Sequence, residues 1–258
     1  YIMENFIRPL LELEEYRQVL DAVKRYPGPV NIVGPSESQK AHICYAILSH
    51  TESKGIYVAF NEMQARRFYE DFAFFLGDGA LFFPTKEVML YDVNAKSLDA
   101  VYQRIYALDR IIRGDYRVVV TSVEAVSHKL TDPGIFKKGI IEIGMESIID
   151  LQDIAKKLVM MGYERVETVE HRGEFAIRGG ILDVYSIDCE MPVRIELFGD
   201  EVDSIRRFDT NTQRSVDSIK NARIIPAREL IYPPEKKESI IKAIREDLAK
   251  AGKKNTAL

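Results

Sequence analysis

The hydrophobic pattern of this chain changes its period part of the way along, and that change limits the folds open to it. Between residues 30 and 121, short apolar runs of strand length alternate with longer segments of helical spacing. Between residues 163 and 225 nearly every segment is typical of a strand or a turn, with glycines between them. The first pattern predicts a mostly parallel, doubly wound sheet with helices on both faces, and the second predicts a smaller antiparallel sheet. The fold class is therefore α/β with an inserted β-rich domain.

The first part supplies most of the predicted elements. Its strands are predicted at residues 30–33, 56–60, 80–83 and 116–121, and its helices at residues 13–25, 39–50, 62–76 and 98–113. Asn61 is expected to cap the helix that follows it, and Asp150 to cap a helix over residues 150–161. A last helix is expected over residues 239–251. These elements predict an α/β domain made of residues 1–148 and 229–258, and a β-rich domain made of residues 149–228.

The β-rich part carries charged side chains on one face of its strands. Arg178 alternates with apolar residues in one predicted strand, and Arg194, Glu196 and Phe198 alternate with apolar residues in another. Arginine and aromatic side chains are typical of protein-docking surfaces, because both give a large contact area at fixed geometry. The same alternation is also found in a sheet whose outer face is only solvated. The pattern alone leaves both interpretations open.

The amino-acid sequence of this part resembles that of a known family. The stretches GYERV, RGEFAIRGGILDV and PVRIELFGDEVDSIRRFD closely resemble the second domain shared by the excision-repair protein UvrB and the transcription-repair coupling factors, Mfd. The resemblance extends more weakly over most of residues 5–230. It implies the UvrB arrangement of domains 1a, 2 and 1b, with a degenerate RecA-like or helicase-like parallel sheet. It also implies that the small domain is where the damage sensor UvrA docks.

The family's partner-binding residues can be carried over motif by motif. In UvrB they are arginines and a glutamate, which fall here on Arg165, Arg178, Arg194 and Glu196. Ala176 stands where UvrB has one further arginine, so part of the surface is altered. The resemblance therefore implies a UvrA-binding site on these four residues.

A defective phosphate loop separates two functions within the family. The P-loop motif G-x-x-x-x-G-K-[ST] lies between a strand and a helix, and Gly34 and Lys40 stand at its spacing. Gln39 replaces the glycine that lets the backbone approach phosphate, and Ala41 replaces the hydroxyl that binds magnesium, while Glu37 adds a negative charge. No apolar strand ending in Asp-Glu supplies a second magnesium ligand. The stretch between Phe83 and Leu98 is also too short for the DNA-inserting hairpin of UvrB.

Together these departures resemble the amino-terminal, UvrB-like module of the coupling factors. The resemblance implies a non-catalytic, cofactor-free module that recruits UvrA to stalled RNA polymerase, within a longer parent that is an ATP-dependent DNA translocase. Both ends of the sequence are expected to be fragment boundaries, and other domains of the parent are expected to cover the docking face. The rival interpretations are a UvrB-type, ATP-dependent damage-loading enzyme and a plain scaffold without a partner.

Composition argues against several other classes. The 36 basic and 40 acidic residues give a formal net charge of −4, so strong DNA binding by this chain is not expected. Cys44 and Cys189 lie far apart in segments of different character, which indicates a reducing cytoplasm. The apolar runs are too short for a membrane span. The four scattered histidines offer neither a metal site nor a catalytic site.

Overall fold

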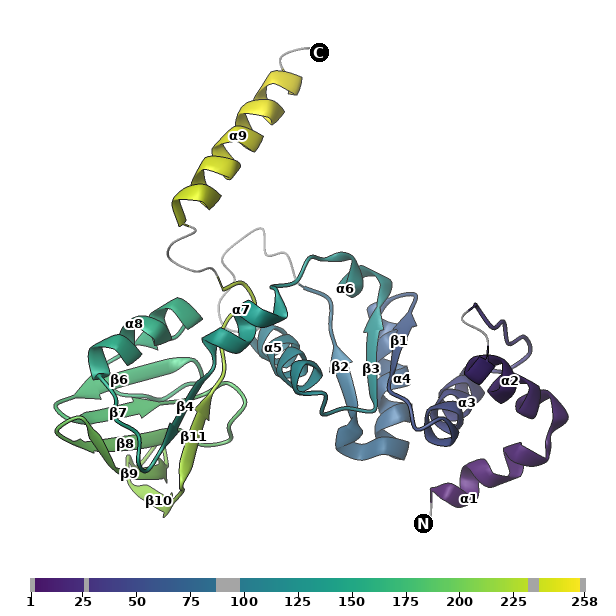
Figure 1. Cartoon of the computed structure of the whole chain (residues 1–258), viewed down its shortest axis with the longest axis horizontal. Coiled ribbons are helices and arrows are strands. Elements are labelled where there is room, and N and C mark those ends of the chain that lie inside the picture. Colours follow the sequence, from purple (N-terminus) through teal and green to yellow (C-terminus); the bar gives the residue numbers. More distant parts are fainter. Residues whose placement is uncertain (1–2, 26–27, 87–97, 232–236, 256–258) are drawn as a thin grey trace. The chain divides into compact units, whose positions relative to one another are not determined.

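The computed structural model describes residues 3–25, 28–86, 98–231 and 237–255 (Figure 1). Its contacts divide the chain into two compact units, Tyr1–Lys129 and Leu130–Leu258. The first is an α/β unit with a parallel sheet, and the second is rich in antiparallel strands. The mixed α/β fold class predicted from the sequence is confirmed. Among the described residues, no helix has both the length and the apolar character that a membrane span requires.

The first unit is built on a parallel sheet of three strands in the order β1-β3-β2. These strands are β1 (Gly55–Ala59), β2 (Ala80–Phe83) and β3 (Val118–Ser122). The helical segments are α1 (Glu4–Ile7), η1 (Arg8–Glu12), α2 (Glu14–Arg25), α3 (Glu37–His50), α4 (Glu62–Leu76), η2 (Gly77–Gly79), α5 (Leu98–Arg113) and α6 (Val123–Ser127). β3 is β-branched along most of its length and buried at every position, as the central strand of a covered sheet should be.

Helices cover the two faces of this sheet. α4 begins after Asn61, whose side chain accepts a hydrogen bond from the backbone N–H of Gln64 at 2.8 Å, as predicted. On the α4 side, the Tyr57 ring of β1 packs against Phe68 of α4, with ring centroids 4.6 Å apart. α5 packs against β2 from the other side, where the guanidinium of Arg104 lies 4.1 Å from the centre of the Phe83 ring. The doubly wound arrangement expected from the alternating pattern is therefore present.

The predicted strand at residues 30–33 is wrong. In the structure these residues form no strand, and the side chain of Val33 is 85% exposed. The central strand β3 already has β1 and β2 as neighbours, so a fourth strand could pair only at an edge of the sheet. Pro29, which precedes the run, has no N–H to give to such an edge, and Gly34 follows with a φ of 110°. A short run with three apolar residues, Val30, Ile32 and Val33, therefore lies outside the sheet.

The second unit contains a six-stranded sheet in the order β10-β9-β8-β7-β6-β5. Its strands are β5 (Glu164–Arg165), β6 (Glu174–Arg178), β7 (Ile181–Val184), β8 (Val193–Phe198), β9 (Glu201–Phe208) and β10 (Ser215–Ser218). All neighbours pair antiparallel except β5 and β6, which are parallel. α7 (Pro133–Gly139) and α8 (Leu151–Met161) precede the sheet, and the side chain of Asp150 caps α8 as predicted.

The second unit also contains a two-stranded sheet. β4 (Ile141–Gly144), which the sequence pattern did not reveal, pairs antiparallel with β11 (Asn221–Ile224). This pairing joins β4 to the β-rich unit, which begins at Leu130 by its contacts. The prediction that residues 229–258 return to the α/β domain stays a prediction.

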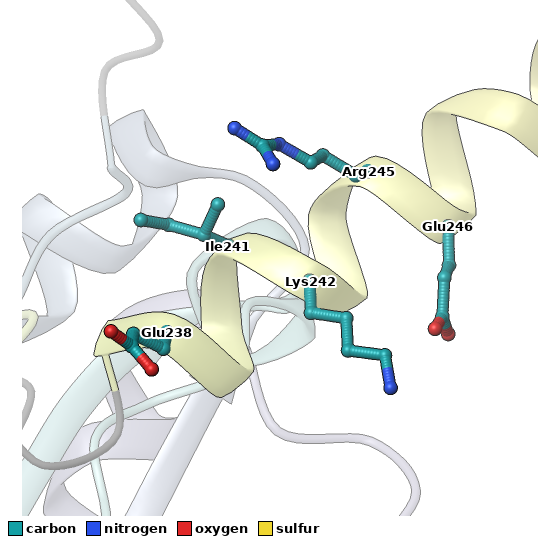
Figure 2. A pocket seen from close by; sticks show the side chains of 5 residues that line it. All are labelled: Glu238, Ile241, Lys242, Arg245 and Glu246. Atoms are coloured by element: carbon teal, nitrogen blue, oxygen red, sulfur yellow. The ribbon is translucent and has the colours of Figure 1, made fainter.

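The last described element is α9 (Lys237–Asn255), which is longer at both ends than the predicted helix. Figure 2 shows five of its side chains around a shallow hollow, and among them Ile241 is 39% exposed. Ile244 and Leu248 continue an exposed apolar stripe along the helix, with exposed fractions of 53% and 66%. Pro233 and Pro234, which the sequence pattern indicates as the exit from the β-rich domain, lie outside the described residues.

Candidate docking surface

Three of the four predicted docking residues share one face of the six-stranded sheet. The strand register places Ala176, Asp183, Arg194 and Arg206 side by side across β6 to β9. A second row, one pleat further along, contains Arg178, Ile181, Glu196 and Ser204. We call these two rows of residues the arginine face. The opposite face, with Phe175, Leu182 and Ile195, belongs to the buried core.

Asp183 is the buried centre of the arginine face. The residue is 1% exposed, and its carboxylate accepts hydrogen bonds from arginines on both neighbouring strands. From β8, Arg194 donates through Nε to Oδ1 at 2.7 Å and through Nη2 to Oδ2 at 2.8 Å. From β6, Arg178 donates through Nη2 to Oδ2 at 2.7 Å. A buried carboxylate needs such partners, since an unpaired charge is costly away from water.

The two arginines differ in exposure. The side chain of Arg194 is only 16% exposed, and its guanidinium lies 4.6 Å from the centre of the Phe208 ring. The pKa of the Arg194 guanidinium is raised above its usual value, and the largest cause is the hydrogen bond to Asp183. The side chain of Arg178 is 51% exposed, although one of its nitrogens is bound to the same carboxylate. Arg178 can therefore contact a partner directly, whereas Arg194 mainly holds Asp183 in place.

One end of the arginine face is closed. Ala176 and Phe208 are buried there with Val169, and Val166 and Tyr185 pack against this cluster. Ala176 lies on the same side of β6 as Arg178, because the two residues are two positions apart in the strand. However, Ala176 is only 1% exposed because the chain before β6 covers it, so it belongs to a small second core rather than to an accessible surface.

The other end of the face is open, and it contains two features relevant to docking that the predicted site residues did not include. Phe198 is 83% exposed at the β8–β9 hairpin. This hairpin lies beside the turn that follows Arg178, because the backbone N–H of Leu197 donates to the carbonyl oxygen of Gly180 at 2.8 Å. Arg206 of β9 lies near Glu196, with 3.6 Å between Nη2 and Oε2. The alternation of apolar and charged residues in SIRRF could have revealed Arg206 as a member of this face.

The structure separates Arg165 from the other three predicted residues. It is exposed on the edge strand β5, and the parallel register sets it beside Phe175. Paired residues of neighbouring strands lie on the same side of a sheet. Arg165 therefore lies at the sheet edge, on the side of the sheet opposite the arginine face. Arg178, Arg194 and Glu196 lie on the arginine face itself.

The loop that precedes α3 is arranged as an ordinary helix start. The side chain of Gln39 accepts a hydrogen bond from the backbone N–H of Ser36 at 2.9 Å, so one donor of the loop is already occupied. The carboxylate of Glu37 accepts from Gln64 of α4 at 2.8 Å. Lys40 is exposed, and Ala41 is fully buried in the core of the unit. A magnesium-binding hydroxyl has no equivalent at that buried position.

The described residues contain no group of three or more histidine, cysteine or acidic side chains placed to hold a metal ion. Cys44 and Cys189 are both free thiols. The stretch proposed to be too short for a DNA-inserting hairpin falls mainly on residues 87–97, outside the described part of the chain.

Comparisons with known proteins agree with this geometry. Residues 141–230 match the family described as the UvrB interaction domain. The chain is 32% identical to a transcription-repair-coupling factor of Bacillus subtilis (strain 168), over 98% of this chain and 22% of that protein. It is 32% identical to the factor of Myxococcus xanthus, over 85% of this chain and 19% of that protein. For a Staphylococcus epidermidis factor the identity is 31%, over 96% of this chain and 21% of that protein. The chain thus spans about a fifth of these relatives, and the resemblance found in the sequence is confirmed.

Proposed function

We propose, since residues 141–230 match the UvrB interaction domain family, that the second unit is a docking module for the repair protein UvrA. In this role the chain recruits UvrA to stalled RNA polymerase during nucleotide excision repair. The similarity to transcription-repair-coupling factors over nearly the whole chain supports the link to transcription. Such a module works in the bacterial cytoplasm, a setting that suits two free cysteines.

The observation that carries the proposal is the open end of the arginine face. Arg178 and Phe198 are exposed at this end, and the partly exposed Glu196 lies in the same row as Arg178 with Ile181 of β7 between them. A half-exposed arginine can pair bidentately with a carboxylate of a partner, and an exposed aromatic ring supplies contact area. Arg194 contributes by holding the face together, and Arg165 adds a contact at the sheet edge.

The proposed module is non-catalytic and needs no nucleotide. Gln39 and Glu37 use their side chains within the protein at the place where phosphate and magnesium would bind. These contacts favour the docking role over a UvrB-type, ATP-dependent enzyme. The chain also carries more acidic than basic residues, which disfavours strong DNA binding by this region alone.

Because the chain spans about a fifth of its relatives, regulation by the remainder of a longer protein is part of the proposal. An exposed arginine face is suited to a contact with another domain of the same protein, which would hide it until the motor domains engage. In this arrangement UvrA and the covering domain compete for the same side chains.

The test is to measure retention of purified UvrA on immobilised residues 1–258 and on a full-length coupling factor that contains them. We expect strong retention on the shorter chain and weaker retention on the full-length protein. Residues 1–258 with Arg207→Ala should retain UvrA as well as the unmodified chain does. Arg207 pairs with Asp217 and shares its register position with Val193, so it lies on the side of the sheet opposite the arginine face. Equal failure of UvrA to bind both proteins would contradict the docking role, and equal strong binding would contradict only the covering contact.

A further inference from the structure

Asp183 is a carboxylate that holds arginines of the docking surface on two strands at once. Its Oδ2 accepts from Arg178 at 2.7 Å and from Arg194 at 2.8 Å, while its Oδ1 accepts from Arg194 alone at 2.7 Å. It is itself 1% exposed and therefore out of reach of a docking partner. Any effect of Asp183 on docking must act through the arginines that it orients.

We propose that Asp183 is a positioning residue, which orders the Arg178 guanidinium before UvrA arrives. This inference rests on the proposed docking function. Arginine loses much rotational freedom when its side chain is fixed, and an interface that must order a free arginine binds more weakly. Asp183 binds one nitrogen of Arg178, whose side chain is 51% exposed, so the other donors of the guanidinium remain available to a partner. A partner carboxylate thus meets a guanidinium that is already oriented.

Arg194 holds Asp183 from the buried side. It approaches Asp183 through two nitrogens, its remaining nitrogen Nη1 donates to the backbone oxygen of Gln213 at 3.2 Å, and its guanidinium stacks on Phe208. These contacts fix the carboxylate, since Arg194 and Asp183 are directly paired across β7 and β8. The exposed arginine is thereby anchored to the second core of the sheet through two intermediate side chains.

The experiment is a double-mutant cycle on UvrA affinity, with Asp183→Asn and Arg178→Ala made singly and together in residues 1–258. An amide has no charge and a single acceptor oxygen, so the substituted side chain cannot hold both arginines as the carboxylate does. We expect Asp183→Asn to weaken UvrA binding about fivefold, the effect of leaving one arginine to be ordered on binding. In the Arg178→Ala background the same substitution should change affinity less than about twofold.

A matched control comes from the other side of the sheet. Asp217 pairs with Arg207 through Nε at 2.9 Å, and Asp217→Asn should leave UvrA affinity unchanged. A fivefold loss that persists without Arg178 would overturn the inference, because Asp183 would then act on the fold or through Arg194. Unchanged affinity in Asp183→Asn would overturn it as well. If Arg178→Ala itself has no effect, the proposed docking face fails, and the inference is decided by the next measurement.

That measurement needs no substitution and therefore no altered fold. Nuclear magnetic resonance relaxation of the Nε–H group reports how ordered each arginine is in the free chain. Arg178 should be nearly as ordered as the backbone, whereas the exposed Arg214, which has no ion-pair partner within the described part of the chain, should be mobile. Equal mobility of Arg178 and Arg214 would show that Asp183 does not order the docking arginine.

Discussion

Arg194 donates two hydrogen bonds to the carboxylate of Asp183 on the neighbouring strand, at 2.7 Å and 2.8 Å. Both side chains are largely shielded from water. Replacing Arg194 by alanine removes the main partner of a buried carboxylate and the ring contact with Phe208. We expect Arg194→Ala to lower the free energy of unfolding by about 2 kcal/mol, the usual scale for a buried charged group that loses a partner. Urea denaturation followed by circular dichroism measures this loss.

Arg206→Ala is the matched comparison, because Arg206 lies on the same face but is 40% exposed and 3.6 Å from Glu196. Its loss should cost less than about 1 kcal/mol. Equal stabilities of the two variants would show that the Arg194–Asp183 pair does not stabilise the sheet.

The second prediction concerns nucleotide. Gln39 and Ala41 replace the residues that let a P-loop approach phosphate and bind magnesium, and Gln39 is engaged with Ser36. Millimolar ATP with magnesium should therefore not shift the melting temperature, because only a ligand that binds the folded state stabilises it. Differential scanning fluorimetry makes the measurement. Micromolar affinity by calorimetry, or turnover that Lys40→Ala abolishes, would revive the enzyme interpretation.

The third prediction concerns DNA. With 40 acidic and 36 basic residues, residues 1–258 should not bind duplex DNA measurably near physiological salt. Fluorescence anisotropy at low and moderate salt checks this. A steep loss of affinity as salt rises would reveal released counterions, and hence a local basic track on the surface.

The fourth prediction concerns pH. Burial, together with the neighbouring Asp188, raises the pKa of Cys189 to about 11. At pH 8 the thiol should react with iodoacetamide about a hundredfold more slowly in the folded chain than in urea, because only the thiolate reacts. A Cys44→Ala background isolates this signal.

The same shift affects stability. The unfolded thiol loses its proton near its ordinary pKa of about 9, before the folded thiol does. The folded state therefore loses stability as the pH rises from about 9 towards 11, and Cys189→Ala should remove that part of the loss. Equal alkylation rates in the folded and unfolded chains would contradict both statements.

Local signals predicted much of this fold. The strand at 80–83 and the helices at 62–76 and 98–113 agree with β2, α4 and α5 because cap residues and helical spacing mark their limits. The run at 30–33 resembles a strand because three of its four residues are apolar and β-branched, but strand formation needs a neighbour to pair with, and pairing is a tertiary property. The sequence pattern does not mark β4, because that strand is defined by pairing with β11, which lies far along the sequence.

The candidate site shows the same division. Alternation placed Arg178, Arg194 and Glu196 on one face correctly, because side chains in a strand alternate by necessity. It could not show that Asp183, which follows Leu182 in an apolar strand, is the buried partner of two arginines. Nor could it show that the chain around Val166 and Val169 covers Ala176. Both depend on which strands become neighbours and on how the loop before β6 folds back.

The most direct test of the docking role is the dissociation constant of UvrA for residues 1–258 and for two variants, Arg165→Ala and Arg178→Ala, measured by calorimetry. Arg165 is exposed, and Asp183 keeps both hydrogen bonds from Arg194 when the half-exposed Arg178 is removed, so each variant should melt within about 3 °C of the unmodified chain. We predict that each substitution weakens UvrA binding at least about tenfold, the loss expected when a guanidinium no longer meets a partner carboxylate. Unchanged affinity in both folded variants would contradict the account and place the docking surface elsewhere.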